Sequence, residues 1–385
     1  MAIEGPSRRT FLQMLVAAGT GAAVSACAPL TQPATSPVAP ISPAASAKPA
    51  WEAQWDQWVA AAGKEGALNL ATLSGAGYTK AIAAFTARYP DIKVEHQAFN
   101  SSSLLIPRVQ RERDGGIYGW DVAQTSQTSL MAVLKPLGTF EPLRPILIRP
   151  DVQDDKLWLG GLDELFSDKD KQSVITFNVS VIRLYVNTDL VKDGEIKSVK
   201  DLLDPKWKGK LLWADVRQGQ TFTPFYSIRE NLGDTVVKQL LIDQQPTFMR
   251  DVRQITEAMV RGQFPVSTGV NPTYLDEFRA QGLGKNVKPL ELPEVRVTSS
   301  GGGLFLFNRA PHPNAAKVFI NWLLTKEGQT AWCEANQWNS RRLDVPPFDK
   351  ETAPTPGVKY LVPQNEERMG AQEDTRKFLE QLVQN

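Results

Sequence analysis

Short apolar strands and amphipathic helices alternate along residues 66–126 of the chain. The first helix of this stretch carries Tyr78, Ile82 and Phe85 on one face, as the 3.6-residue period of an α-helix requires. Strands that alternate with helices of this length form β-α-β units and pair in parallel. We expect strands at 66–74, 92–99 and 121–126, and helices at 78–90 and 103–116, the latter with Pro107 in its first turn.

The same alternation returns in the second half of the chain. Its most regular part is a long amphipathic helix that we expect at 315–337, and a last helix is expected at 373–383. Further strands are expected at 174–187, 208–216, 265–270 and 296–308, with helices at 223–233, 235–243, 255–263 and 274–282. The pattern predicts an α/β protein, and 385 residues suit one large domain or two of medium size.

The first 26 residues have the organisation of a bacterial export signal. SRRTFL at 7–12 resembles the twin-arginine signal, and VSAC at 24–27 resembles the lipobox of bacterial lipoproteins. The second resemblance implies cleavage before Cys27 and lipidation of Cys27. A transmembrane helix is disfavoured, because spanning a bilayer takes roughly 20 apolar residues. Residues 27–50 are rich in Pro, Ala, Ser and Thr and are predicted to be a disordered tether.

Charge and cysteine content narrow the classes of function. The chain has 43 Lys and Arg against 42 Asp and Glu, and these charges are scattered, which argues against nucleic-acid binding. Its two cysteines are Cys27 and Cys333, so a lipidated Cys27 leaves no partner for a disulfide. We expect Cys333, His96 and His312 to be structural. An exported enzyme is a rival class, but the sequence has no G-x-S-x-G, H-E-x-x-H or C-x-x-C motif.

Several longer stretches resemble one protein family, and they do so in the family's order. The most specific is 184–215, where a strand that ends in YVNTDL is followed by DLLDPKWKGK and a further strand. The others are WVAAAGKEGALNLATLSG, AAFTARYPDIKVE, TEAMVRGQFPVSTGVNPTYLDEFRAQG and HPNAAKVFINWLLTKEGQTAW. Together they resemble the extracellular solute-binding proteins of bacterial ABC importers, in the branch that includes ferric-iron-binding proteins.

The resemblance implies an α/β fold of the type II periplasmic-binding-protein kind. Two lobes, each a mostly parallel sheet flanked by helices, would be joined by crossover strands. Lobe 1 would comprise 51–150 and 270–345, lobe 2 would comprise 151–269, and 346–385 would be a C-terminal extension and helix that packs on the lobes. A small solute would be held between the lobes, which hinge shut around it.

The resemblance also implies partners and a location. The solute would be delivered to an ABC permease and its ATPase, and the protein itself would be a monomer with no enzyme activity and no cofactor. We expect it on the periplasmic or extracellular side of the cell envelope, held to the membrane by lipid at Cys27.

Ligands of open α/β sheets bind beyond the carboxyl ends of the strands, so the loops that follow the strands are the candidate site. In the first half these loops carry hydroxyls and N–H groups at helix starts, which favour anionic ligands, although helix capping is their simpler role. Arg217 can bind a carboxylate, phosphate or phosphonate bidentately, or form a surface ion pair. The candidate ligand-binding residues are Ser74, Gly75, Tyr78, Ser101, Ser102, Thr125, Ser126, Arg217, Gln220, Thr221, Thr273 and Tyr274.

Ferric iron is the alternative ligand. The iron-binding relatives carry two adjacent tyrosines where this chain has Thr273 and Tyr274. Fe³⁺ takes several hard anionic oxygens as ligands, and one phenol supplies a single oxygen. We therefore predict a small polar or anionic solute, such as a carboxylate, a phosphonate or a sugar phosphate, and no metal. Residues 301–303 are three glycines without the G-K-[ST] context of a phosphate loop, and we expect a close backbone crossing there.

Overall fold

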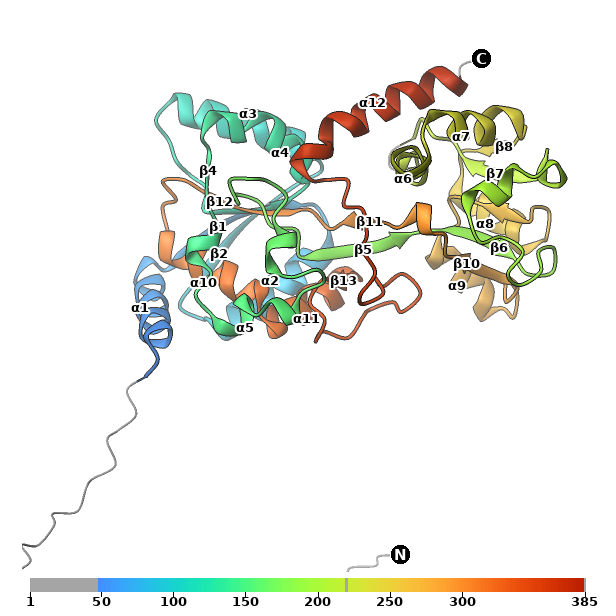
Figure 1. The fold of residues 1–385 in the computed structure, drawn as a ribbon. Helices are drawn as coiled ribbons and strands as arrows, with labels where there is room; N and C mark the ends of the chain where they lie inside the picture. The colour runs from blue at the N-terminus through green and yellow to red at the C-terminus, as the bar shows by residue number, and fades with distance from the viewer. Residues whose placement is uncertain (1–47, 219–220, 384–385) are drawn as a thin grey trace, which may run out of the picture. The chain divides into compact units, whose positions relative to one another are not determined.

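The computed structural model of the protein describes residues 48–218 and 221–383 (Figure 1). The predicted export signal, Cys27, most of the predicted tether and Gln220 lie outside the described residues. Within the described ranges, no helix is both long and apolar enough to cross a membrane. The α-helices are α1 (Ala50–Glu65), α2 (Ala76–Arg88), α3 (Ser102–Asp114), α4 (Gln127–Val133), α5 (Pro150–Gln153), α6 (Thr223–Leu232), α7 (Asp234–Lys238), α8 (Val252–Val260), α9 (Pro272–Ala280), α10 (Pro313–Leu324), α11 (Lys326–Asn336) and α12 (Glu366–Val383).

Short helical turns of other kinds connect these elements. A π-helical turn, η7 (Gln239–Asp243), continues α7. The 3-10 turns are η1 (Lys135–Leu137), η2 (Arg144–Ile146), η3 (Asp155–Leu157), η4 (Leu162–Leu165), η5 (Val199–Leu203), η6 (Pro205–Trp207) and η8 (Pro293–Val295).

The first sheet has five strands in the order β2-β1-β3-β12-β4. Strand β1 pairs in parallel with β2 on one side and with β3 on the other, which confirms the predicted β-α-β units. Strands β12 and β4 complete the sheet in antiparallel pairs. The bounds are β1 (Ala67–Leu73), β2 (Lys93–Phe99), β3 (Val122–Thr125), β4 (Phe140–Glu141) and β12 (Gly303–Phe307).

The second sheet also has five strands, in the order β10-β6-β9-β7-β8. Strand β7 pairs in parallel with β8 and with β9, so three strands end at the same edge. Strand β6 pairs antiparallel with β9 and β10. The bounds are β6 (Leu184–Asn187), β7 (Leu211–Ala214), β8 (Thr247–Met249), β9 (Val266–Ser267) and β10 (Val287–Leu290).

A small antiparallel sheet, β11-β5-β13, continues along the chain into the second sheet (Figure 1). Strand β5 (Phe177–Ile182) is followed after Arg183 by β6, and β10 precedes β11 (Val297–Ser300). Strand β13 (Asn339–Ser340) pairs with the start of β5. Strands β5 and β11 are therefore the crossover strands, and the predicted fold class, α/β with two helix-flanked sheets, is confirmed.

Two segments belong to a different sheet from the one that we predicted. Residues 151–176 were expected in lobe 2. Their apolar side chains, such as that of Val152, are instead buried in the core around the first sheet. Residues 270–295, expected in lobe 1, contribute β10 to the second sheet. The burial of apolar side chains decides which core a segment joins, and the order of elements along a sequence does not reveal it. We therefore propose 51–176 and 301–345 for lobe 1, and 184–295 for lobe 2.

Several helix bounds differ from the prediction, and two of the differences have a visible local feature. The helix expected at 315–337 is interrupted at Thr325, whose Oγ1 accepts a hydrogen bond from the N–H of Gly328 and caps α11. Helix α3 begins at Ser102 because Ser101 caps it, so Pro107 lies inside the helix and not in its first turn. The break at Thr325 was missed because capping side chains decide where a helix begins, whereas apolar periodicity only shows that a helix is present.

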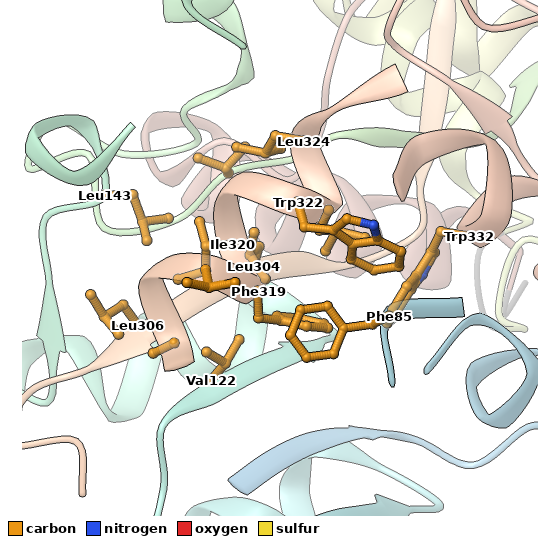
Figure 2. Close-up of a cluster of buried hydrophobic side chains, with 14 of the residues drawn as sticks. Phe85, Val122, Leu143, Leu304, Leu306, Phe319, Ile320, Trp322, Leu324 and Trp332 are labelled. Atoms are coloured by element: carbon orange, nitrogen blue, oxygen red, sulfur yellow. The ribbon is translucent and has the colours of Figure 1, made fainter. Parts of the chain in front are cut away.

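Aromatic side chains from α2, α10 and α11 form the centre of the first core (Figure 2). Phe85 lies edge-on to Phe319 with ring centroids 5.1 Å apart, and Trp332 lies edge-on to Phe319 at 6.1 Å. Such pairs contribute about 0.5–1.5 kcal/mol beyond their buried area. Cys333 lies beside Trp332 in this core, where burial raises the pKa of its thiol to about 12. Its predicted role as a buried structural thiol is thus confirmed.

Candidate ligand-binding site

A cavity of about 320 Å³ lies at the carboxyl end of the second sheet. Ala214 is the last residue of β7 and Thr268 follows β9, and both line the cavity, which is where open α/β sheets bind ligands. The volume lies at the lower end of the usual range of ligand pockets, about 300–1,000 Å³. We call it the Arg183 cavity, and its lining residues are Val181, Ile182, Arg183, Tyr185, Ala214, Thr221, Pro224, Val252, Thr268, Gly269, Val270, Asn271, Pro272 and Thr352.

Arg183 supplies the positive charge of this cavity. It lies between β5 and β6, and its side chain is 8% exposed. Its Nη2 lies 2.6 Å from Oε1 of Glu291 and donates to the carbonyl of Ala353 at 3.4 Å. Its Nε has no hydrogen-bond partner among residues 48–218 and 221–383. This nitrogen is covered by the protein, so a ligand would meet Arg183 through the small accessible part of its side chain, where the positive charge favours an anion.

The helix starts around the cavity add less than Arg183 does. Helices α8 and α9 both begin at its wall. The carboxylate of Asp251 already accepts two backbone N–H groups at the start of α8, and the side chain of Asn271 accepts one at the start of α9. Because these caps use donors that would otherwise be unpaired, Arg183 is the stronger anion-binding group.

The rest of the wall is neutral and closely packed. Burial raises the pKa of Tyr185 to about 12, so its phenol keeps its proton at neutral pH and can donate a hydrogen bond. The Oγ1 of Thr268 accepts a hydrogen bond from the N–H of Ala214 at 2.9 Å, which joins the ends of two strands. Gly269 has a φ of +80°, and a Cβ there would lie 2.7 Å from that of Ala214, so glycine is required at this position.

Thr221 is the one predicted site residue of the described ranges that lines the Arg183 cavity. Its hydroxyl donates to the carbonyl of Asp215 at 2.5 Å. Arg217 donates from Nε and Nη2 to the carboxylate of Asp215, at 2.8 and 2.7 Å, so most of its fork is occupied. This pair, with a further bond from Arg250, holds the pKa of Asp215 well below its usual range. Gln220 lies outside the described residues.

Thr273 and Tyr274 follow two lining residues of the cavity at the start of α9. Thr273 is exposed and Tyr274 is half-buried, with the guanidinium of Arg253 5.0 Å from the centroid of its ring. In the part of the chain that the structure describes, no three His, Cys, Asp or Glu side chains gather as a metal site. Among the described residues that line the cavity, the one charged side chain is the cation Arg183.

The predicted hydroxyl residues of the first lobe lie at the ends of β1, β2 and β3, and none of them lines the Arg183 cavity. The Oγ of Ser74 donates to Oδ1 of Asn100 at 2.8 Å, and Gly75 is the N-cap of α2. Ser101 accepts a hydrogen bond from the N–H of Ser103 and caps α3. These contacts match the simpler capping role. The remaining members are Ser102 and Thr125, which are buried, and Ser126, which is exposed and precedes α4.

Tyr78 lies in the first core. Its ring is edge-on to Trp332 and to Trp338, with centroids 5.9 Å away in each case. Burial raises the pKa of its phenol to about 12. These contacts account for Tyr78 as a packing residue, consistent with its place on the apolar face of α2.

The residues that sequence reasoning missed are Arg183 and Tyr185. The signal for Arg183 was present, because it is the one charged residue in the apolar run VSVIRLYV at 179–186. An arginine in a buried strand is rarely left without a partner, so its presence there indicates a paired or ligand-binding charge.

Comparison with known proteins identifies the family of the chain. Residues 80–352 match the family described as bacterial extracellular solute-binding protein. An uncharacterized protein of Haemophilus influenzae is 28% identical over 229 residues, which are 55% of this chain and 62% of that protein, so the match spans less than two thirds of that relative.

Solved structures with the same fold include several binding proteins. Apo FutA2 from Synechocystis is similar with a TM-score of 0.60 and 18% identity, over 83% of this chain and 99% of that one. The Bordetella ferric binding protein is similar with a TM-score of 0.63 and 18% identity, over 82% of this chain and 98% of that one. AfuA from Actinobacillus pleuropneumoniae, with fructose-6-phosphate bound, is similar with a TM-score of 0.51 and 19% identity. The similarity covers 83% of this chain and 98% of that one. The chain therefore belongs to the family of bacterial extracellular solute-binding proteins.

Proposed function

We propose that the protein is the substrate-binding component of an ABC importer and captures a small anionic solute in the Arg183 cavity. The guanidinium of Arg183 carries this proposal, since it is the one charged group among the lining residues of the described chain and only its Nη2 is paired there, at the carboxyl end of the second sheet. A carboxylate, phosphonate or phosphate would accept a charge-assisted hydrogen bond from it. AfuA, one of the similar structures, holds an anionic sugar phosphate, which supports this class of solute.

The mechanism follows from the crossover strands. Strands β5 and β11 connect the two sheets, and a few residues in such connections can act as a hinge. A solute that contacts both lobes would favour their closed form, which the permease and its ATPase would recognise. The hydroxyl loops of the first lobe, with Ser74, Ser101 and Ser126, are the proposed second half of the site. We also propose that the protein is a monomer, held at the outer face of a membrane by lipid at Cys27.

Ferric iron is the second candidate. The Bordetella structure is described as a ferric binding protein, and Tyr274 follows two residues that line the Arg183 cavity. If iron binds here, Fe³⁺ should produce a visible phenolate-to-iron absorption band that Tyr274→Phe abolishes. Absence of this band with ferric citrate would remove iron from consideration.

The test of the proposed function is a thermal-stability screen of the full chain against small carboxylates, phosphonates, sugar phosphates and ferric citrate. A solute present at one hundred times its dissociation constant stabilises the folded protein by about 2.7 kcal/mol. We expect an anionic solute to raise Tm and to be recovered chemically unchanged. Stabilisation by none of the anions would contradict the proposal, and conversion of the solute would indicate an enzyme.

A further inference from the structure

Arg341 is a second buried arginine, and no carboxylate of the described chain forms an ion pair with it. It follows β13 and is 5% exposed. Its backbone is held on both sides, because its N–H donates to the carbonyl of Thr176 and its carbonyl accepts from the N–H of Leu159, each at 2.9 Å. The guanidinium is therefore kept inside the protein. Burial lowers its pKa to about 10, so it still carries its charge at neutral pH.

The neighbouring Arg342 shows how this protein neutralises a buried guanidinium. Arg342 is 3% exposed, its Nε donates to Asp344 at 2.7 Å and its Nη1 donates to the carbonyl of Leu324 at 2.9 Å. At Arg341, neither Nε nor Nη1 has a hydrogen-bond partner within residues 48–218 and 221–383. Both nitrogens are covered by the protein, so an anion from outside the chain would compensate this costly buried charge through the accessible part of the side chain, which lines a cavity.

Arg341 lines a cavity of about 260 Å³, which we call the Arg341 cavity. It shares no lining residue with the Arg183 cavity. Its other charged residues are Lys359 and Glu164, so two cations face one carboxylate. Tyr360 also lines it, and the hydroxyl of Tyr360 accepts a hydrogen bond from the N–H of Thr355 at 3.0 Å, which leaves its proton available to donate.

We propose that the Arg341 cavity binds a small oxyanion, a carboxylate or a phosphate. Arg341 is the principal donor, and Lys359 and Tyr360 are the other donors. The excess of positive charge favours an anion over a neutral solute. The cavity is smaller than the usual range of ligand pockets, about 300–1,000 Å³, which suits phosphate or a short carboxylate. This proposal is independent of the solute that occupies the Arg183 cavity.

Occupation of this site would affect the crossover strands. One wall of the cavity is the C-terminal segment 357–362. Within it, the N–H of Leu361 donates to the carbonyl of Arg296 at 2.7 Å and its carbonyl accepts from the N–H of Thr298 at 3.0 Å. Thr298 belongs to β11, which pairs with β5. A bound anion would therefore hold this segment against the crossover strands, and its binding should stabilise the whole chain.

The competing explanation is that Glu164 neutralises Arg341 in solution. Glu164 is exposed and its charge acts on Arg341, but the two form no ion pair in the described structure. The two explanations predict opposite results for Glu164→Gln. If an anion binds, this change removes a repelling carboxylate and tightens binding. If Glu164 is the partner, the change leaves a buried charge unpaired and destabilises the protein.

The experiment uses the full chain and measures binding of inorganic phosphate and of acetate by calorimetric titration, with Tm recorded at constant ionic strength. The variants are Arg341→Met, Glu164→Gln and, as the control in the other cavity, Arg183→Met. We expect Arg341→Met to weaken binding of at least one anion by about tenfold or more and to remove its effect on Tm. Because the Arg183 cavity is also proposed to take an anion, we expect Arg183→Met to remove at most its own binding event and to retain the event that Arg341→Met weakens, and we expect Glu164→Gln to tighten that event.

Stability without added anion is the second measurement. Arg341→Met should be at least as stable as the parent chain, because it replaces an unmatched buried charge by a shorter, apolar side chain. The response to phosphate against acetate then identifies the oxyanion that the site takes. The proposal is overturned if neither anion binds, if Arg341→Met keeps all binding while Arg183→Met loses it, or if Arg341→Met and Glu164→Gln are both destabilised and non-additive.

Discussion

The Nη2 atom of Arg183 lies 2.6 Å from Oε1 of Glu291, while the Nε of the same guanidinium has no partner in the described chain. One nitrogen of this cation is therefore held by an exposed carboxylate, and the positive charge can still act on an anion at the accessible part of the side chain. An arginine fixed in this way loses little conformational freedom when it binds an anion.

Replacement of Arg183 should remove the main anion-binding group of the Arg183 cavity. We expect Arg183→Met to weaken the binding of the anionic solute found in the stability screen by about ten- to one hundredfold. A hydrogen bond to a charged group contributes about 1.5–3 kcal/mol. Glu291→Gln is the matched control, and it should preserve or raise affinity because it removes a competing acceptor. Calorimetric titration measures both. Equal losses in the two variants would show that the ion pair, and not the positive charge of Arg183 alone, determines binding.

The paired carboxylate of Asp215 predicts how stability changes in acid. Arg217, and then Arg250, lower the pKa of this carboxyl below its unfolded value of about 3.9. A lowered folded pKa stabilises the protein above the unfolded pKa, and this stabilisation is lost as the pH falls through the folded pKa. Asp215→Asn should therefore cost about 1–3 kcal/mol at pH 7, and the difference from the parent should shrink below about pH 4.

Thermal unfolding between pH 2.5 and 7 checks this prediction. Asp193→Asn is the control, because Asp193 is exposed and forms no ion pair in the described ranges, and it should change stability by less than about 0.5 kcal/mol at every pH. A cost of Asp215→Asn that stays constant down to pH 2.5 would contradict the inferred direction of the pKa change.

Much of the fold could be predicted because periodicity is a local property. The apolar face of α2, with Ile82 and Phe85, and the alternation of β1 and β2 with α2 and α3 are visible in the sequence alone. The lobe to which Val152 belongs is not visible, because its burial depends on partners far away in the chain. The break at Thr325 did leave a local signal, because a glycine follows three residues later and its N–H donates a hydrogen bond to the threonine hydroxyl. The apolar periodicity continues across the break and hides it.

The site was harder to predict than the fold. Hydroxyl residues such as Ser101 are common at helix starts, and the structure shows that Ser101 caps α3. Arg217 follows a strand, but a carboxylate two residues away in sequence occupies its fork. Arg183 was missed because it lies inside a strand-like run and not in a loop. Whether an arginine is paired is decided by tertiary contacts, such as that with Glu291, which no spacing rule supplies.

The ammonium group of Lys135 anchors the start of α12. Its Nζ lies 3.0 Å from Oδ2 of Asp168 and 2.7 Å from Oε2 of Glu366, the first residue of α12. Lys135 is 10% exposed and the side chain of Asp168 is fully buried. Breaking a buried pair costs about 3–5 kcal/mol, and we expect the lower end for Lys135→Met because two backbone N–H groups also bind Asp168.

Urea unfolding of Lys135→Met and of a surface control measures this cost. Lys169 is exposed and lies 3.5 Å from Glu367, so Lys169→Met removes an ion pair of the same type at the surface. Exposed pairs contribute about 0–1 kcal/mol, and we expect the smaller part of this range. If the two variants lose equal stability, the Lys135 cluster contributes no more than a surface pair.

Two variants of Trp332 compare how packing of its ring and its unpaired indole N–H affect the stability of the first core. Its ring is stacked on Phe177 with centroids 6.0 Å apart, and its Nε1 has no hydrogen-bond partner among the described residues. Trp332→Ala opens a large cavity and should cost about 3–5 kcal/mol. Trp332→Phe keeps an aromatic ring and removes the unpaired N–H, so its cost should stay below about 1.5 kcal/mol. Guanidinium unfolding of both variants measures the difference, and equal losses would contradict the assignment of most of this cost to packing of the ring.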